Sequence, residues 1–131
     1  MNANQGPTPE NQPTLRVTTQ PNDANPKGDI FGGWLMSQID IAGAIAATAP
    51  AKGDVSTVAV KNLQFINPLF SHDVVSFYTN VSHIGSTSVT VDIEVYAQRR
   101  MDLTKSYVKI AEACLVYVAV ELPGLKRLIP K

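Results

Sequence analysis

Hydrophobic and polar positions alternate along most of the chain with a period of two, which is typical of half-buried β-strands. In the clearest example Val89, Val91 and Ile93 fall on one face, and Asp92 and Glu94 fall on the other. The runs are rich in Val, Ile, Thr and Tyr and are separated by turn residues. They predict a short first strand and four long ones at residues 15–19, 55–66, 74–84, 87–98 and 107–120.

One segment, residues 34–49, reads as a helix of about four turns that ends at Pro50. Its polar side chains are few, and a helix that is apolar nearly all round is buried. One helix followed by four long strands predicts an α+β fold in which a curved antiparallel sheet packs around the helix. We expect a single domain over residues 15–131, preceded by a flexible leader at 1–14 that is rich in Asn, Gln and Pro.

Composition narrows the classes of partner. Lys plus Arg and Asp plus Glu both number 11, so the formal charge of zero gives no reason to expect a nucleic-acid partner. No apolar run is long enough to span a bilayer, so we expect no membrane association. The one cysteine, Cys114, excludes an internal disulfide and favours a cytoplasmic location.

Asp40 is the leading candidate for chemistry, because it is the one charge on the predicted helix. A carboxylate in an apolar setting loses hydration and becomes a stronger base, which suits a general base or a nucleophile. The alternative is a structural carboxylate paired with a Lys or Arg. Small or polar residues, Gly33, Ser37 and Ala44, share its stripe at i±3 and i±4 spacing and offer room for a ligand.

Two further groups lie near the predicted helix start. Backbone N–H groups at Gly32 and Gly33 would lack helical partners, and such donors stabilise an oxyanion. The alternative for this pair is close packing of loop on strand. The Asn25 amide could donate to a carbonyl oxygen, but an Asx-turn is the more economical interpretation from its neighbours.

Spacing along the helix separates these groups. Gly33 and Asp40 are seven residues apart, or roughly 10 Å at 1.5 Å per residue, so one carbonyl group cannot touch both. If both act on one substrate, they come from different chains. Two antiparallel helices in a dimer would bring Asn25, Gly32 and Gly33 of one chain to Asp40 of the other.

The turn formed by Gly85, Ser86, Thr87 and Ser88 offers hydroxyl and N–H groups to a ligand, although an ordinary hairpin explains it equally. The two histidines show neither metal-site nor triad spacing. No metal and no redox cofactor is therefore expected.

Several segments together resemble the hotdog acyl-CoA thioesterases, in the YciA-like bacterial branch related to the brain acyl-CoA hydrolase. The resemblance covers nearly all of the chain after the leader. It rests on Asn25, Gly28-Asp29-Ile30-Phe31-Gly32-Gly33-Trp34, Ser37-Gln38-Ile39-Asp40, Ala42-Gly43-Ala44, Val58-Ala59-Val60, Phe65-Ile66-Asn67-Pro68, Phe77-Tyr78, Gly85-Ser86-Thr87-Ser88, Val116-Tyr117-Val118-Ala119-Val120 and Arg127-Leu128-Ile129-Pro130.

This resemblance implies hydrolysis of acyl-CoA to a carboxylic acid and coenzyme A. It implies that Asp40 is the catalytic carboxylate, and that Asn25, Gly32 and Gly33 bind the thioester from the opposing subunit of a dimer, which often assembles into a tetramer or hexamer. It further implies that the turn from Gly85 to Ser88 helps to hold coenzyme A.

Two features depart from the family pattern. Ser86 stands where relatives often carry a basic residue, which weakens the case for a phosphate contact there. Pro26 and Lys27 are not the commonest version of the loop.

Two rival functions fit parts of the pattern. A hotdog hydratase or dehydratase usually relies on a histidine near the helix start, and none lies between Gly28 and Pro50. A non-catalytic acyl-CoA sensor would keep the pocket and carry a DNA-binding extension, for which the chain has no room.

Overall fold

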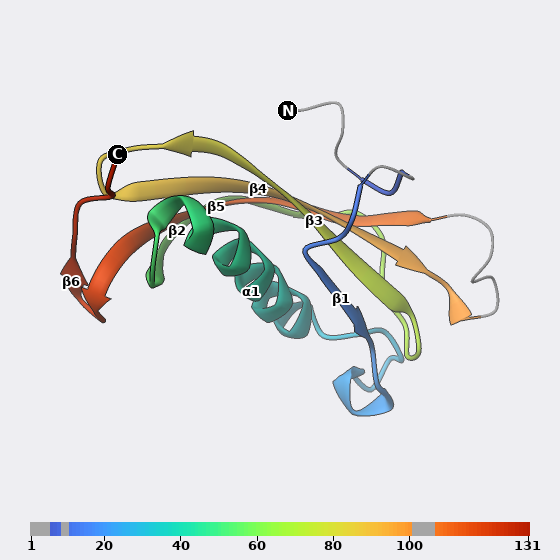
Figure 1. Cartoon of the computed structure of the whole chain (residues 1–131). Helices are drawn as coiled ribbons and strands as arrows, with labels where there is room; N and C mark the ends of the chain where they lie inside the picture. Colours follow the sequence, from blue (N-terminus) through green and yellow to red (C-terminus); the bar gives the residue numbers. More distant parts are fainter. Residues whose placement is uncertain (1–5, 9–10, 101–106) are drawn as a thin grey trace.

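The computed structural model describes residues 6–8, 11–100 and 107–131. In these residues one antiparallel sheet curls around one long helix, which lies along its concave side (Figure 1). This is the hotdog fold, as predicted. The elements are β1 (Leu15–Thr18), the short 3₁₀ helix η1 (Pro21–Asp23), α1 (Gly32–Ala51), β2 (Val55–Phe65), β3 (Val74–Ile84), β4 (Ser88–Gln98), β5 (Val108–Leu122) and β6 (Leu125–Lys126).

The five predicted strands form within one or two residues of their expected bounds, and β6 is an addition. The sheet order is β1-β3-β4-β5-β2, with β6 paired to β5. The period-two pattern has the expected consequence, because Val89, Val91 and Ile93 are fully buried beneath the helix. The order leaves β2 at one edge of the sheet, and most of its residues are exposed.

The helix is longer than the sequence pattern predicts. It begins at Gly32 and continues through Pro50 to Ala51, so Gly32 and Gly33 belong to its first turn. A proline this near the end removes one backbone bond without breaking the helix. Lys52 then adopts a left-handed conformation with φ 58°, and the N–H of Gly53 donates to Thr48 O at 3.3 Å, which ends the helix.

The leader and the domain meet at a backbone hydrogen bond, in which Thr14 N donates to Phe77 O of β3 at 2.8 Å. Gly6 is buried against the Tyr96 ring. The expected flexibility of residues 1–14 stays a prediction, because residues 1–5 and 9–10 lie outside the described part of the chain.

Only one side of α1 is buried by the sheet. Its inner face carries Leu35 and Ile39 together with small residues that let the helix approach closely, and the full set is Leu35, Ile39, Ala42, Gly43, Ala47 and Ala51. Burying a Leu or Ile side chain contributes roughly 1.5–3 kcal/mol. On the outer face Met36, Ile41 and Ile45 are each close to half exposed. The apolar character of the helix therefore exceeds what the sheet of one chain covers.

Tyr117 of β5 sets the distance between helix and sheet. This side chain is fully buried, and its hydroxyl donates to the backbone carbonyl of Asp40 at 2.8 Å. Gly43 lies directly over it, since a Cβ at residue 43 would stand 2.1 Å from the hydroxyl oxygen. The glycine at 43 is thus required by close approach rather than by backbone conformation.

We expect Gly43→Ala to lower the free energy of unfolding by about 2 kcal/mol, because the added methyl group overpacks the contact with Tyr117. In an open helical position the same change stabilises by up to about 1 kcal/mol. Gly33→Ala is the matched control, since a Cβ at residue 33 meets nothing within 4 Å. Urea unfolding of both variants measures the difference, and equal stability of the two would contradict this account of Gly43.

Burial, then the negative charge of Asp40 and the hydrogen bond to it, raise the pKa of Tyr117 far above its ordinary 10.0. Stability from the protonated hydroxyl is therefore fully present below pH 10 and is lost as the pH rises beyond it. At neutral pH we expect Tyr117→Phe to cost about 1 kcal/mol for the lost hydrogen bond. Between about pH 9 and about pH 11 its unfolding free energy should fall less steeply than that of the wild type. Parallel slopes in urea titrations would argue against the raised pKa.

Candidate active site

Asp40 lies in the middle of α1 and is partly buried at the wall of a cavity between α1 and β2. The cavity measures about 260 Å³ and is mostly apolar, with two hydroxyl groups near the carboxylate. Its lining residues are Met36, Ser37, Ile39, Asp40, Thr57, Val60, Leu63 and Leu115. Ser37, predicted to face a ligand, thus shares the cavity of Asp40, and its hydroxyl donates to Trp34 O at 2.7 Å.

The carboxylate of Asp40 is held by Thr57. The Thr57 hydroxyl donates to Asp40 Oδ1 at 2.5 Å. A register irregularity between β2 and β5 begins directly after Thr57, and bulges of this kind re-aim side chains beside functional sites. Within the described residues Asp40 makes no ion pair, so its alternative role as the partner of a Lys or Arg finds no support. Sequence reasoning missed Thr57, because a threonine in a strand is an ordinary strand former.

Thr57 and Tyr117 are direct cross-strand neighbours on β2 and β5. One holds the side chain of Asp40 and the other holds its backbone carbonyl. Asp40 is therefore held both at its carboxylate and at its backbone carbonyl.

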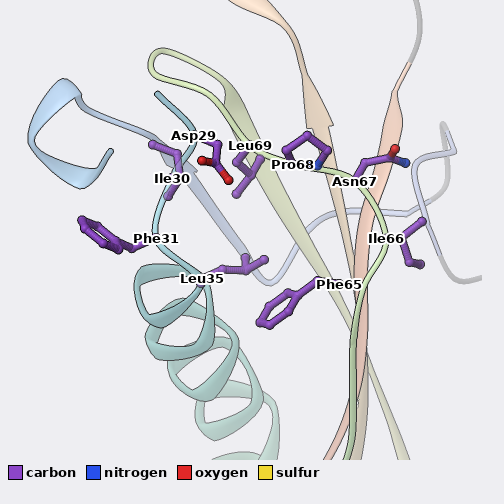
Figure 2. A pocket seen from close by; sticks show the side chains of 10 residues that line it. Asp29, Ile30, Phe31, Leu35, Phe65, Ile66, Asn67, Pro68 and Leu69 are labelled. Carbon is purple, nitrogen blue, oxygen red and sulfur yellow. The ribbon is translucent and has the colours of Figure 1, made fainter. Parts of the chain in front are cut away.

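The helix start borders a second cavity of about 380 Å³ between α1 and the end of β2. Figure 2 shows the side chains around it, with Leu35 pointing from α1 toward Phe65 at the end of β2 and Phe31 projecting from the helix start on the opposite side. The complete lining is Asp29, Ile30, Phe31, Gly32, Leu35, Phe65, Ile66, Asn67, Pro68 and Leu69. This second cavity was not predicted, since its two walls come from segments that are thirty or more residues apart in the sequence.

Gly32 and Gly33 are exposed in the first turn of α1. Phe31 occupies the N-cap, and its side chain forms no capping hydrogen bond. First-turn N–H groups have no partner within a helix, so they remain as donors at the cavity mouth. The partial positive charge of a helix N-terminus favours an oxyanion at this place.

Asn25 adopts the Asx-turn that its neighbours suggested. Its Oδ1 accepts from Lys27 N at 2.8 Å and from Gly28 N at 3.1 Å. The turn uses the carbonyl end of the amide and leaves Nδ2 as the donor available to a ligand. Asn25 lines neither of the two cavities described above.

Within one chain the predicted groups do not converge. Gly32 and Asp40 line different cavities, in agreement with their separation of about 12 Å along the helix. Each chain thus presents the Asp40 carboxylate at one cavity and the first turn of α1 at another.

The turn from Gly85 to Ser88 is a hairpin fastened to the C-terminal segment. Gly85 N donates to Ser88 O at 2.8 Å, and Ile129 N donates to Ser86 O at the same distance. Thr87 O accepts from Ala119 N of β5. None of the four residues lines the cavities of Asp40 or Gly32, and their role toward coenzyme A stays a prediction.

No group of three or more His, Cys, Asp or Glu side chains in the described residues could hold a metal ion. In the same residues no helix has both the length and the apolar character needed to cross a membrane.

Comparison with known proteins places these features in a family. The sequence model of the thioesterase superfamily matches residues 27–104. The acyl-CoA thioester hydrolase YciA of Salmonella typhimurium is 42% identical over 125 residues, which cover 94% of this chain and 93% of the relative.

Two solved structures share the fold at high identity. A hexameric hotdog fold thioesterase of Campylobacter jejuni superposes with a TM-score of 0.84 and 40% identity, covering 90% of each chain. A hexameric thioesterase from Yersinia pestis gives a TM-score of 0.85 and 40% identity, covering 95% of this chain and 99% of the other. The chain belongs to the thioesterase superfamily, in the family of the YciA acyl-CoA thioester hydrolases.

Proposed function

We propose that the protein hydrolyses acyl-CoA thioesters at a site built by two chains. Asp40 in its cavity is the observation that carries the proposal, because it offers a fixed carboxylate beside room for a ligand. The relatives support the substrate class, since YciA is named an acyl-CoA thioester hydrolase. A thioester is an activated acyl group, so a positioned carboxylate and an oxyanion site suffice for its hydrolysis.

The second chain is proposed from the apolar surface that one chain leaves uncovered. Met36, Ile41 and Ile45 project from α1, and Val58 and Val60 from the edge strand β2, each about half exposed. Contiguous apolar surface of this kind marks a protein–protein interface. The related thioesterases from Campylobacter jejuni and Yersinia pestis are hexamers, which favours a second copy as the partner.

A twofold axis beside α1 would make the two halves of the site meet. Two antiparallel helices related by an axis near Met36, midway between Gly32 and Asp40, would place the N-terminus of each beside the middle of the other. Gly32, Gly33 and Asn25 of one protomer would then face Asp40 and Thr57 of its partner. The roughly 10 Å between donors and carboxylate within a chain is no obstacle in such a dimer.

The reaction follows from these roles. The thioester carbonyl oxygen accepts hydrogen bonds from the N–H groups of Gly32 and Gly33 and from Asn25 Nδ2, which stabilise the negative charge that develops there. Thr57 holds Oδ1 of Asp40, which leaves Oδ2 to act on a water molecule or on the carbonyl carbon. A C–O bond forms, the C–S bond breaks, and the products are a carboxylic acid and the thiol of coenzyme A.

Asp40 can bring about the attack on the carbonyl carbon by two routes. As a general base it takes a proton from water, which attacks the carbonyl carbon directly. As a nucleophile it forms a mixed anhydride, which water then cleaves. Both routes consume one water molecule per thioester and need the same two-chain geometry.

We expect Asp40→Asn to reduce kcat/KM for acyl-CoA by about 10³-fold or more, because a catalytic base or nucleophile is lost. Thr57→Val should cost about 10-fold, since the carboxylate stays but is less well oriented. Thr48→Val is the control, because the Thr48 hydroxyl also lies on this helix but donates to Ala44 O, away from the site. Thiol release from coenzyme A measures all three, and an active Asp40→Asn enzyme would refute the assignment.

Mixing two inactive variants tests the shared site. Asn25→Asp keeps the Oδ1 acceptor of the turn and removes the Nδ2 donor, while Asp40→Asn removes the carboxylate. In randomly mixed dimers half are hybrids with one intact site in two, so about one quarter of wild-type activity should return. Each variant alone should recover nothing after the same unfolding and refolding. A mixture that stays inactive would mean that each chain builds its own site.

A further inference from the structure

The loop after β2, residues 66–73, is held by an ion pair that the proposed chemistry does not use. Arg99 Nη1, just beyond β4, donates to Asp73 Oδ2 at 2.6 Å. The Asp73 side chain is 3% exposed, whereas that of Arg99 is 29% exposed. A charge buried to this degree is tolerated when it is paired and hydrogen-bonded.

Both partners also bond the backbone of the loop. Arg99 Nη1 donates to Pro68 O at 3.0 Å, and the guanidinium lies 5.2 Å from the centre of the Phe70 ring. Asp73 Oδ2 accepts from Phe70 N at 2.8 Å. Within this loop His72 has a φ of 70°, a left-handed conformation that is uncommon for a residue other than glycine. The ion pair therefore holds a tight turn at several points.

Thr19, the residue that follows β1, also bonds to this loop. The hydroxyl of Thr19, fully buried next to β1, donates to Phe70 O at 2.6 Å and accepts from Asp73 N at 2.9 Å. The loop is thereby joined to β1 and β4 at once.

The same loop pairs through its backbone with residues 29–30, the segment that leads into α1. Ile30 N donates to Leu69 O at 2.8 Å, and Asp29 pairs with Phe70 in an isolated antiparallel bridge. Ile30 and Leu69 are both buried. Figure 2 shows Asp29, Ile30 and Leu69 clustered where the two segments run side by side. Gly32 follows Ile30 by two residues, so the position of the loop sets the position of the first helical turn.

We propose that Arg99 and Asp73 are positioning residues that fix the oxyanion donors of Gly32 and Gly33 through the loop 66–73. This inference rests on the proposed function, which assigns those donors. Neither side chain lines the cavity at the helix start, so neither touches substrate there. They act by holding Leu69 and Phe70, which hold Asp29 and Ile30 at the entry to α1.

Arg99→Met tests the inference. Displacing oxyanion donors by about 1 Å can cost up to roughly 10²-fold in rate, so we expect kcat for acyl-CoA to fall at least 10-fold. KM should change by less than about 3-fold, because the donors bind the transition state more strongly than the substrate. The matched control is Lys109→Met, which removes the cation of the other ion pairs, with Glu94 and Glu112. Its kcat should stay at the wild-type value.

Two further variants separate positioning from folding. Arg99→Lys restores the charge opposite Asp73 and should recover part of the lost kcat. The double variant Arg99→Met with Asp73→Asn leaves no buried charge unpaired, so it should fold even where Arg99→Met alone does not. Because the guanidinium contacts to Pro68 and Phe70 are still absent, its kcat should remain low. A folded double variant with wild-type kcat, or a loss confined to KM, would overturn the inference.

Asp40→Asn, assayed in parallel, distinguishes failure of the positioning role from failure of the proposed function. If Asp40→Asn is inactive while Arg99→Met has normal kcat, the positioning role fails and the proposed function stands. If Asp40→Asn is active, the proposed function itself fails, whatever Arg99→Met does.

Discussion

The close contact between the Tyr117 side chain of the sheet and Gly43 of the helix is the one on which the rest of the structure depends. It sets both the height of α1 above the sheet and its rotation about its own axis. With the helix at that height the carboxylate of Asp40 reaches Thr57, the cross-strand neighbour of Tyr117. A larger side chain at residue 43 would lift the helix and draw Asp40 away from its partner. One glycine thus couples core packing to the position of the Asp40 carboxylate.

The features that follow from local pattern were predicted well. Alternation in residues 55–66, 74–84, 87–98 and 107–120 located the strands, because side chains in a strand alternate between faces. Asp40 stood out because a lone charge on an apolar helix needs an explanation, and the structure places it in a cavity. The rough length of the helix between Gly33 and Asp40 was enough to separate the two groups. These inferences need only the geometry of single elements.

The features that the sequence pattern did not predict depend on contacts between residues that are far apart in the sequence. Thr57 is seventeen residues from Asp40, and Arg99 is twenty-six from Asp73, and neither spacing carries a periodic signal. The prediction that the helix ends at Pro50 was wrong, because the helix continues through Pro50 to Ala51 and a proline this near the end does not break it. The turn from Gly85 to Ser88 could be located but not assigned, since its role depends on what lies opposite it in an assembly.

The exposed edge strand β2 also bears on how the protein is made. In the described part of the chain no strand pairs with its outer edge, and exposed Val58, Val60 and Phe65 lie on this strand. Such an edge is a template for pairing with any other extended chain. A protomer that has not yet met a partner is therefore exposed to aggregation through this edge. The surface that the proposed function assigns to a partner chain is thus also the one that makes a solitary chain prone to aggregation.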